Sequence, residues 1–344
     1  MYISKSRLIL KIWKNLKTKL ANNLFNILLS LIIILALVSI SFSSIKWIIF
    51  DSNWKVVTSN LSLFAFGSYP ASERWRPAVW IFSLLFLSVV TLLGPNWKWL
   101  RKNLILGWIS TLPLGLYLLY GGYGLSQVMS RNWGGLTLTI FLTICSSFFA
   151  FPLGIFLALC RQSSFSLIKK ISSLYIDFMR AIPLIAVLFF GQLLIPLFLP
   201  SGLEIDRVWR AVLAFTLFVS AYIAEDLRGG LQAIAKTQIE SANSLGLSNF
   251  QIKRFILIPQ SIRIALPSLT NQAIGLFQNT SLMAILGLVE LLGVGRSILA
   301  NPEFIGQYME VYIWLASVYW LFCTTFAIIG RHLELKMIRN RSNS

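Results

Sequence analysis

The stretch QIESANSLGLSNFQIKRFILIPQS, Gln238–Ser261, is a polar segment that separates two long apolar runs of this 344-residue chain. A connection between neighbouring helices usually takes only about two to eight residues. More than thirty residues lie between Leu227 and Ile264. That length predicts a loop with a structure of its own, and its surroundings indicate what the loop is for.

The composition indicates a membrane protein. Hydrophobic residues make up 56% of the sequence and charged residues only 12%, whereas a soluble domain carries about 25% charged residues. So few charges cannot cover a globule of this size, and the apolar surface must therefore face lipid. The expected fold class is an all-α polytopic membrane protein.

Eight segments are apolar and long enough to be candidate spans, since a bilayer core of about 30 Å needs roughly 20 residues per helix. Their ranges are 24–40, 78–93, 104–120, 136–159, 174–199, 208–223, 266–292 and 311–329. The seventh is the least regular, because several prolines, amides and hydroxyl residues interrupt it. The quoted stretch lies between the sixth and the seventh.

The basic residues fall mainly on one side of this eight-span arrangement. If both termini are cytoplasmic, 22 of the 30 Lys and Arg residues lie on the cytoplasmic side, six of them in residues 1–23 before an uncleaved first span. That asymmetry follows the positive-inside rule. It places the quoted stretch in the cytoplasm and explains the net charge of +18 without a nucleic-acid partner. The expected location is a membrane, with both termini in the cytoplasm and lipid around the chain.

The first three predicted spans differ from the rest. A long loop, 41–77, joins the first two and contains Trp47, Trp54 and Trp75, a residue type that suits membrane interfaces. We therefore expect an N-terminal extension over residues 1–130 and a five-span unit over residues 131–344. Three scattered cysteines and a single histidine, His332, predict no metal site and no disulfide framework.

The polar loop has its own helix signals. Apolar residues from Leu227 to Leu245 recur on one helical face, and Gly246 stands where a helix ends. Ser248 and Gln251 then have the spacing of a capping box, and Pro259 limits or kinks the second helix. These signals predict two short amphipathic helices, at about 228–262, with a glycine turn. They either cover the bundle or dock on a partner.

The spacing Glu240-Ser241-Ala242, three residues, Gly246, nine residues, Ile256-x-Ile258-Pro259 resembles the EAA motif of bacterial ABC importer permeases. In that family the loop docks on a separate ATPase subunit. The resemblance implies an ATPase-coupling role for the matching and adjoining positions: Glu240, Ser241, Ala242, Gly246, Leu247, Ile256 and Pro259.

Further blocks resemble the polar amino-acid branch of these permeases, the histidine, glutamine and arginine type. They are YIDFMRAIPLIAVLFF (175–190), AYIAEDLRGGLQAI (221–234) and LFQNTSLMAILGLVELL (276–292). The span count makes the chain similar to the longer permease of general L-amino-acid transporters. The implied fold is a type I importer core of five helices with a three-helix extension.

The resemblance also implies partners. They are an ABC ATPase, a second permease that is identical or a paralogue, and an extracytoplasmic substrate-binding protein. This chain lacks a G-x-x-x-x-G-K-[ST] loop that would cradle phosphate, so we expect ATP and Mg²⁺ on the ATPase and no cofactor here. It is expected to be a transport subunit and not an enzyme. An ion-coupled secondary amino-acid transporter without an ATPase is the alternative.

Polar residues inside the spans are candidates for the substrate path, because such groups usually face one another or water. They are Gln192, Gln278, Asn279, Thr280 and Ser281. Hydrogen bonding between helices explains them equally well. For Asp177 with Arg180, and for Glu225 and Asp226 with Arg228, a local ion pair or a contact with lipid headgroups is the ordinary expectation.

Overall fold

The structure is a computed structural model that describes residues 24–94, 98–200 and 202–342. Within these residues the regular structure is helical, apart from two isolated backbone bridges. The basic segment 1–23 lies outside the described residues. The chain divides into two compact units, with the boundary between Lys55 and Val56, and each is described by itself.

The described part of the first unit is one helix and its end. Helix α2 (Leu24–Lys46) continues into a π-helical turn at Trp47–Asp51. The Ser52 hydroxyl and the Trp54 indole N–H both donate to the Ile48 carbonyl, at 2.6 and 3.0 Å. The run Asn26–Asp51 is long and apolar enough to cross a membrane, in agreement with the first predicted span.

The remaining helices follow from Lys55 onward. The longer ones are α5 (Trp75–Leu93), α6 (Lys98–Tyr120), α7 (Gly135–Arg161), α8 (Ser166–Ala181), α11 (Arg207–Gln232), α14 (Ile258–Asn279) and α16 (Tyr308–Ser342). The shorter ones are α3 (Lys55–Thr58), α4 (Leu61–Phe66), α9 (Leu184–Phe189), α10 (Ile195–Phe198), α12 (Lys236–Ser244), α13 (Asn249–Gln251) and α15 (Leu291–Leu299).

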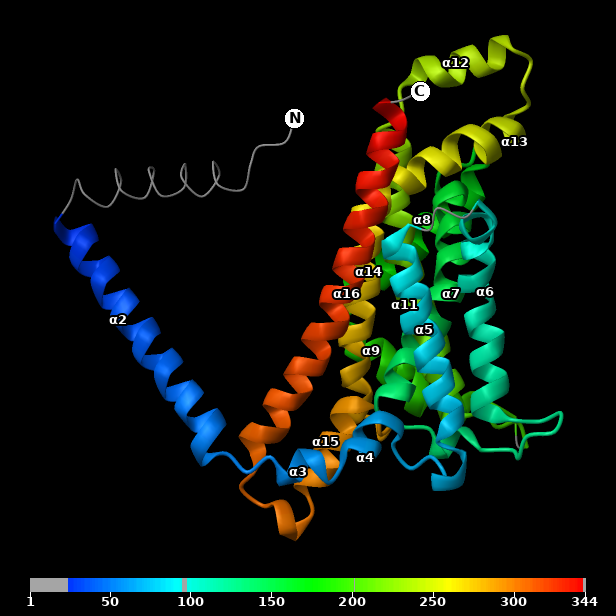
Figure 1. The fold of residues 1–344 in the computed structure, drawn as a ribbon. Coiled ribbons are helices and arrows are strands. Elements are labelled where there is room, and N and C mark those ends of the chain that lie inside the picture. Colours follow the sequence, from blue (N-terminus) through cyan, green and yellow to red (C-terminus); the bar gives the residue numbers. More distant parts are fainter. Residues whose placement is uncertain (1–23, 95–97, 201, 343–344) are drawn as a thin grey trace. The chain divides into compact units, whose positions relative to one another are not determined.

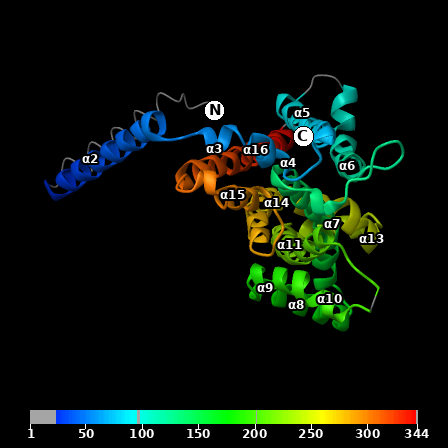
Figure 2. The ribbon, with the colours of Figure 1, turned by 90° about the horizontal axis from the view of Figure 1, so that it is seen from below.

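Helices α7, α11 and α14 form the centre of the second unit. Helix α11 packs along α7 and α14, and α16 packs on α14. Seen along the helices, α8 to α10 lie on one side of this centre, and α5, α6 and α16 lie on the other (Figure 2). A glycine allows α7 and α11 to approach closely. A Cβ atom added to Gly154 of α7 would lie only 2.5 Å from the Ile223 side chain of α11, which is too close for any other residue.

Six helices among the described residues are long and apolar enough to cross a membrane, or seven if one bent pair counts as a single span. That pair is α8 with α9–α10, bent by 105°, where the sequence predicts one span over 174–199. The break follows from Pro183, because the residue before a proline avoids helical conformation. Ile182 is accordingly extended, with ψ 138°.

The seventh predicted span, 266–292, has wrong boundaries. Helix α14 begins at Ile258 and ends at Asn279, where a 3₁₀ turn, Thr280–Ala284, follows. Its 22 residues make about 33 Å of helix, enough to span a bilayer core, although it is more polar than the six candidates. The apolar run continues beyond the helix, but Gly287, with φ +82°, separates it from α15.

Helices α5 and α6 pair with each other, and the segment before them contacts α7. The indole N–H of Trp80 on α5 donates to the Thr111 carbonyl of α6 at 2.9 Å. The Thr137 hydroxyl of α7 donates to the Ala65 carbonyl of α4 at 2.8 Å. A Cβ on Gly67 would lie only 2.4 Å from Gly134 Cα, so this contact requires glycine.

Candidate functional site

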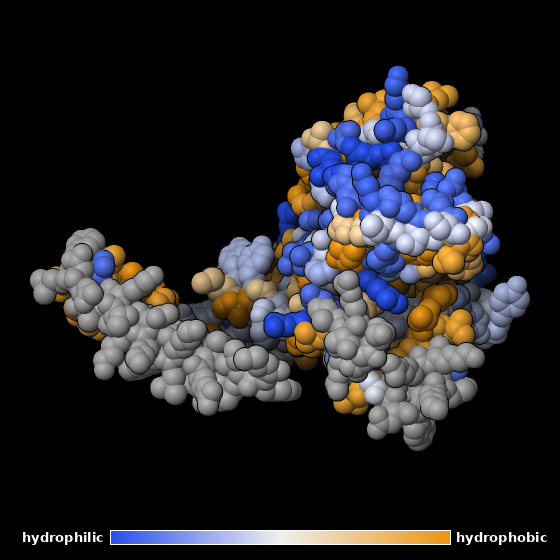
Figure 3. Space-filling view, turned by 90° about the horizontal axis from the view of Figure 1, so that it is seen from above, coloured by the Kyte–Doolittle hydropathy of each residue, from blue (hydrophilic) through white to orange (hydrophobic). Residues whose placement is uncertain are grey.

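The polar loop, residues 233–257 between α11 and α14, lies at one end of the helical bundle with α12 and α13 (Figure 1). We call this the polar-loop end. Figure 3 looks onto it, and hydrophilic side chains gather there. The predicted continuous helical face from Leu227 to Leu245 is wrong in one respect. Helix α11 ends at Gln232 and α12 begins at Lys236, so the two segments have separate axes.

A Schellman motif ends α12, as the sequence predicts for Gly246. The Leu247 N–H donates to the Ala242 carbonyl at 3.2 Å, and the Gly246 N–H donates to the Asn243 carbonyl at 2.9 Å. Gly246 has φ +77°, a left-handed conformation that glycine adopts without strain. The turn therefore fixes the direction in which the chain leaves α12.

The next helix starts with the predicted capping box. The Gln251 side chain accepts from the Ser248 N–H at 2.8 Å, and the Gln251 N–H donates to the Ser248 hydroxyl at 3.3 Å. Helix α13 then passes through a π-helical segment, Ile252–Leu257, into α14. Pro259 lies in the first turn of α14. It changes the helix type without ending the helix, because a wider turn avoids the clash between the proline ring and an earlier carbonyl.

The predicted coupling residues differ in exposure. Ala242 is buried, with 3% exposed, whereas Glu240 and Ser241 are exposed. Ser241, Ala242, Leu247 and Ile256 line one shallow hollow of about 310 Å³, together with Thr237, Gln238 and Leu245. Glu240, Gly246 and Pro259 do not line it.

Large apolar side chains are exposed on this loop. Leu245 is 80% exposed, Phe250 68% and Phe255 65%. The Gln260 amide of α14 donates to the Gln238 side chain of α12 at 2.8 Å, so α12 is also connected directly to the bundle. A rigid polar loop that presents apolar groups beside a hollow can dock on another protein.

A cluster of ion pairs lies at the base of the polar loop. Arg228 makes two contacts with the Glu225 carboxylate, at 2.6 and 3.0 Å. Arg161, the last residue of α7, lies 3.2 Å from the same carboxylate, and Arg180 of α8 lies 3.5 Å from it. Asp177 pairs with Arg161 at 3.1 Å. Glu225 thus connects three helices close to the start of the loop.

This cluster corrects the expected local pairing. The predicted partner of Asp177 was Arg180, on the same helix, but Asp177 pairs with Arg161 and Arg180 pairs with Glu225. The local pair of Glu225 with Arg228 is present. Asp226 accepts from the Gln272 amide of α14 at 3.2 Å. Sequence spacing identifies neighbours on one helix, whereas Arg161 and Glu225 are 64 positions apart.

The five candidate path residues do not form one cluster. The Gln192 amide N–H donates to the Arg207 carbonyl at 2.8 Å, and the Arg210 guanidinium donates to the Gln192 backbone carbonyl at 2.7 Å. Gln192 is 4% exposed, so its contacts favour hydrogen bonding between helices. Thr280 is fully buried and donates to the Phe277 carbonyl at 2.7 Å. On α14, Gln278 is exposed and Asn279 is partly buried, as is Ser281 after them.

A buried carboxylate at the opposite end of the bundle was missed by the sequence analysis. Glu290 is 0% exposed and caps α15, accepting from the N–H groups of Leu292 and Gly293 at 2.9 Å each. The Tyr319 hydroxyl of α16 and the Thr139 hydroxyl of α7 lie 3.2 and 3.4 Å from it. A glutamate directly before the apolar-periodic residues 291–299 is an N-cap signal that sequence reasoning could have used.

Known proteins resemble most of the chain. Residues 150–339 match the family described as "Binding-protein-dependent transport system inner membrane component". That match covers more than half of the chain. The chain belongs to this family. The family match confirms two predictions from the sequence: the helical membrane fold, and the resemblance to ABC permeases that the EAA-like spacing indicates.

Two relatives of the family also match beyond that region. The "Inner membrane amino-acid ABC transporter permease protein YhdY" of Escherichia coli (strain K12) is 36% identical over 84% of this chain and 79% of its own. The "Glutamate/glutamine/aspartate/asparagine transport system permease protein BztC" of Rhodobacter capsulatus is 32% identical over 83% of this chain and 79% of its own.

A solved structure of a related transporter has a similar fold. The structure described as "Crystal structure of an amino acid ABC transporter with histidines" superimposes with a TM-score of 0.53 at 31% identity. It covers 59% of this chain and 92% of the other. The part of this chain covered by that structure is smaller than the part aligned with YhdY. The chain and YhdY are therefore also similar outside the region that the solved structure covers.

Proposed function

We propose that this chain is the transmembrane permease subunit of an ATP-driven amino-acid importer. The single observation that carries the proposal is that this chain, a member of the family, has a polar loop with a defined structure. A Schellman turn and a capping box hold exposed Leu245 beside a shallow hollow. That arrangement suits a coupling element that another subunit grips, and the named relatives are amino-acid permeases.

The coupling step follows from the connections of α12. An ATPase that moves α12 also moves the base of α11, because only residues 233–235 separate the two helices. The carboxylate of Glu225 then passes the movement to α7 and α8 through its arginine partners. Separating these partly buried ions would break several charge-assisted hydrogen bonds, which favours movement of the helices together. Glu240, Ser241, Ala242, Gly246, Leu247, Ile256 and Pro259 remain the proposed ATPase-coupling residues.

We also propose an orientation in the membrane, a set of partners and a substrate path. The polar-loop end and both termini lie in the cytoplasm, in agreement with the distribution of basic residues. ATP and Mg²⁺ bind to the ATPase, a second permease completes the path, and a binding protein delivers the amino acid on the other side. Residues 1–130 form an extension and residues 131–344 the permease core. Gln278, Asn279 and Ser281 line the substrate path, with Thr280 behind them.

The secondary-transporter alternative finds no support among the relatives, which are ABC transporter permeases. Uptake measurements separate the two functions directly. The chain is co-expressed with a candidate ATPase and binding protein and placed in proteoliposomes, and uptake of a panel of labelled amino acids is followed. The proposal expects uptake only with ATP and the binding protein. Uptake that an ion gradient drives without ATP would establish the alternative.

The partner contact has a test of its own. Glu240→Lys reverses an exposed charge on α12, and we expect it to reduce co-purification of the ATPase. The matched control is Glu204→Lys, because Glu204 is an exposed glutamate at the opposite end. Equal recovery of the ATPase with both variants would show that α12 is not the docking element.

A further inference from the structure

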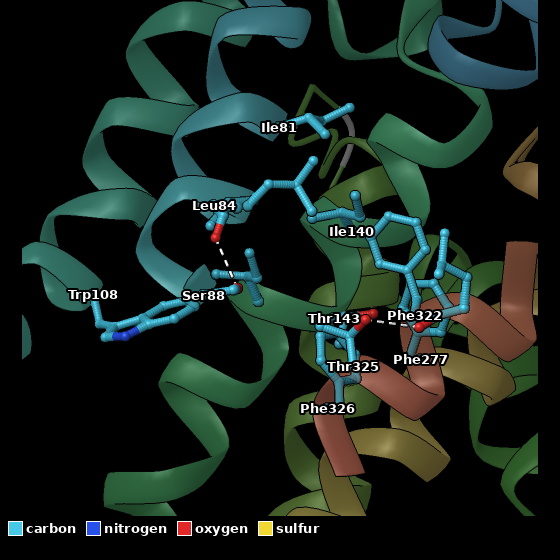
Figure 4. Close-up of a pocket in the computed structure, with 13 residues that line it drawn as sticks. Ile81, Leu84, Ser88, Trp108, Ile140, Thr143, Phe277, Phe322, Thr325 and Phe326 are labelled. Atoms are coloured by element: carbon cyan, nitrogen blue, oxygen red, sulfur yellow. Dashed lines mark hydrogen bonds between the residues drawn. The ribbon is translucent and has the colours of Figure 1, made fainter. Parts of the chain in front are cut away.

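An apolar cavity lies between α5 and α6 on one side and α7, α14 and α16 on the other (Figure 4). Its volume is about 180 Å³. The side chains that form its walls come from all five helices and include Leu84, Trp108, Ile140, Phe277 and Phe322. Two elements of the proposed extension and three of the proposed core therefore meet around one space.

A second cavity of about 430 Å³ adjoins the first. Both are lined by Trp108, Thr143, Ile144 and Phe326. The second continues along α7 toward α11 and the middle of α14. The two cavities thus share one wall and extend to different helices.

The polar atoms at the first cavity are already satisfied. The hydroxyls of Ser88, Thr143 and Thr325 each donate to a carbonyl of their own helix, at 2.8 Å. The Trp108 indole N–H donates to the Thr91 hydroxyl at 3.1 Å. The lining residues include no charged side chain. The hydroxyl hydrogens are therefore already engaged and no charged group is present, so the cavity offers little to water, which needs two or more polar partners, or to a charged free amino acid.

The helices around the cavity indicate what kind of molecule can enter it. The lining residues of α5, α6, α7 and α16 lie inside helices that are long and apolar enough to cross a membrane, so hydrocarbon surrounds them. Leu85 and Leu321, which also line the cavity, are 45% and 57% exposed. The cavity therefore reaches the lipid-facing surface between α5 and α16, and a thin apolar chain can enter there.

We propose that this cavity binds an acyl chain of a membrane phospholipid, which packs between α5–α6 and the helices α7, α14 and α16. Helix α6 packs on α5 but meets α7 at few positions. An acyl chain in the gap supplies the missing apolar contacts of Trp108 and Phe326. The bound lipid holds α5 and α6 against the rest of the bundle. This proposal is independent of the transported substrate.

The test uses the full chain in nanodiscs that contain phosphatidylethanolamine with a photoactivatable diazirine on one acyl chain. After illumination, mass spectrometry locates the labelled peptides and the labelled residues. We expect labelling at the cavity residues of α5, α6 and α16 above the labelling of Phe82. Phe82 is a matched reference, because it is on α5, is 70% exposed and does not line the cavity.

Two variants fill the space from different walls. Thr143→Phe adds a ring at the wall shared by the cavities, and Ser88→Phe adds one from α5; Phe82→Trp is the control. Because the added ring occupies the space that the acyl chain would fill, we expect cavity labelling to fall about tenfold in both variants, which corresponds to roughly 1.4 kcal/mol, and to persist in the control. Two results would overturn the proposal. One is labelling of the wild type no stronger at the cavity than at Phe82, and the other is undiminished labelling in a folded filled variant.

Discussion

The guanidinium of Arg161, the last residue of α7, lies 3.2 Å from the carboxylate of Glu225 on α11. Arg180 of α8 reaches the same carboxylate, which Arg228 also holds at 2.6 Å. The three arginines come from three different helices. One anion thus determines how the bases of these helices sit beside the polar loop, and the proposed coupling relies on that arrangement.

Replacing this anion by its amide tests the arrangement. Glu225→Gln keeps the shape but removes the charge, and hydrogen bonds to charged groups contribute about 1.5–3 kcal/mol each. We expect ATP-dependent uptake in proteoliposomes to fall about tenfold, which corresponds to roughly 1.4 kcal/mol, while ATPase co-purification is retained. Glu204→Gln at the opposite end is the control. Uptake that is unchanged at equal protein abundance would contradict the role of Glu225.

The capping box gives a local prediction. Ser248→Ala removes the side-chain acceptor for the Gln251 N–H, and loss of an N-cap reduces helix stability by about 1 kcal/mol. We expect faster amide hydrogen exchange over residues 248–257 and no change in α16. Ser248→Asp retains an acceptor and is the matched control. If the alanine and aspartate variants exchange at the same rate, the capping box does not stabilise this segment.

Two glutamines in the spans are expected to behave differently. Gln192 connects the π-helical segment Phe190–Leu194 to the start of α11, so Gln192→Ala removes a hydrogen bond that contributes about 0.5–1.5 kcal/mol. It should lower the melting temperature and leave the relative uptake of different amino acids unchanged. Gln278 is exposed on α14, and Gln278→Ala should change that relative uptake and leave the melting temperature near the wild-type value. The opposite pattern would show that Gln278 stabilises the fold and that Gln192 contributes to amino-acid selectivity.

Glu290 is expected to stabilise the fold. Its carboxylate caps α15 and also contacts α7 and α16. Glu290→Ala leaves buried donors without a partner, which costs about 1–3 kcal/mol for each, and should lower the melting temperature by several degrees. The control is Glu204→Ala, at an exposed glutamate. Equal melting temperatures for the two variants would show that the Glu290 contacts add no stability.

Local signals in the sequence predict the polar loop well. The Schellman glycine and the capping box act through residues three to five positions apart, and both are present as predicted. The boundaries of the helices are less predictable, because hydropathy does not register the turn at Ile182–Pro183 or the end of α14 at Asn279. Apolar residues continue through the first break, and after the second they resume at Leu282, beyond four polar residues.

The contacts between helices could not be predicted from spacing. Arg161 and Glu225 meet because α7 and α11 pack along each other, and Glu290 reaches Tyr319 through the packing of α15 on α16. Gln192 illustrates the same limit. Its polar side chain in a span indicates a partner, but only the fold identifies that partner as the Arg207 carbonyl.

The central claim is that the polar loop couples an ATPase to transport, and its turn offers the most direct test. Gly246→Pro cannot adopt φ +77°, because proline fixes φ near −65°. Gly246→Asn is the control, since asparagine tolerates the left-handed conformation. The measurement is ATP-dependent amino-acid uptake at equal membrane abundance. We predict that the proline variant inserts normally and loses uptake, while the asparagine variant retains most of it. Wild-type uptake by the proline variant would contradict the claim.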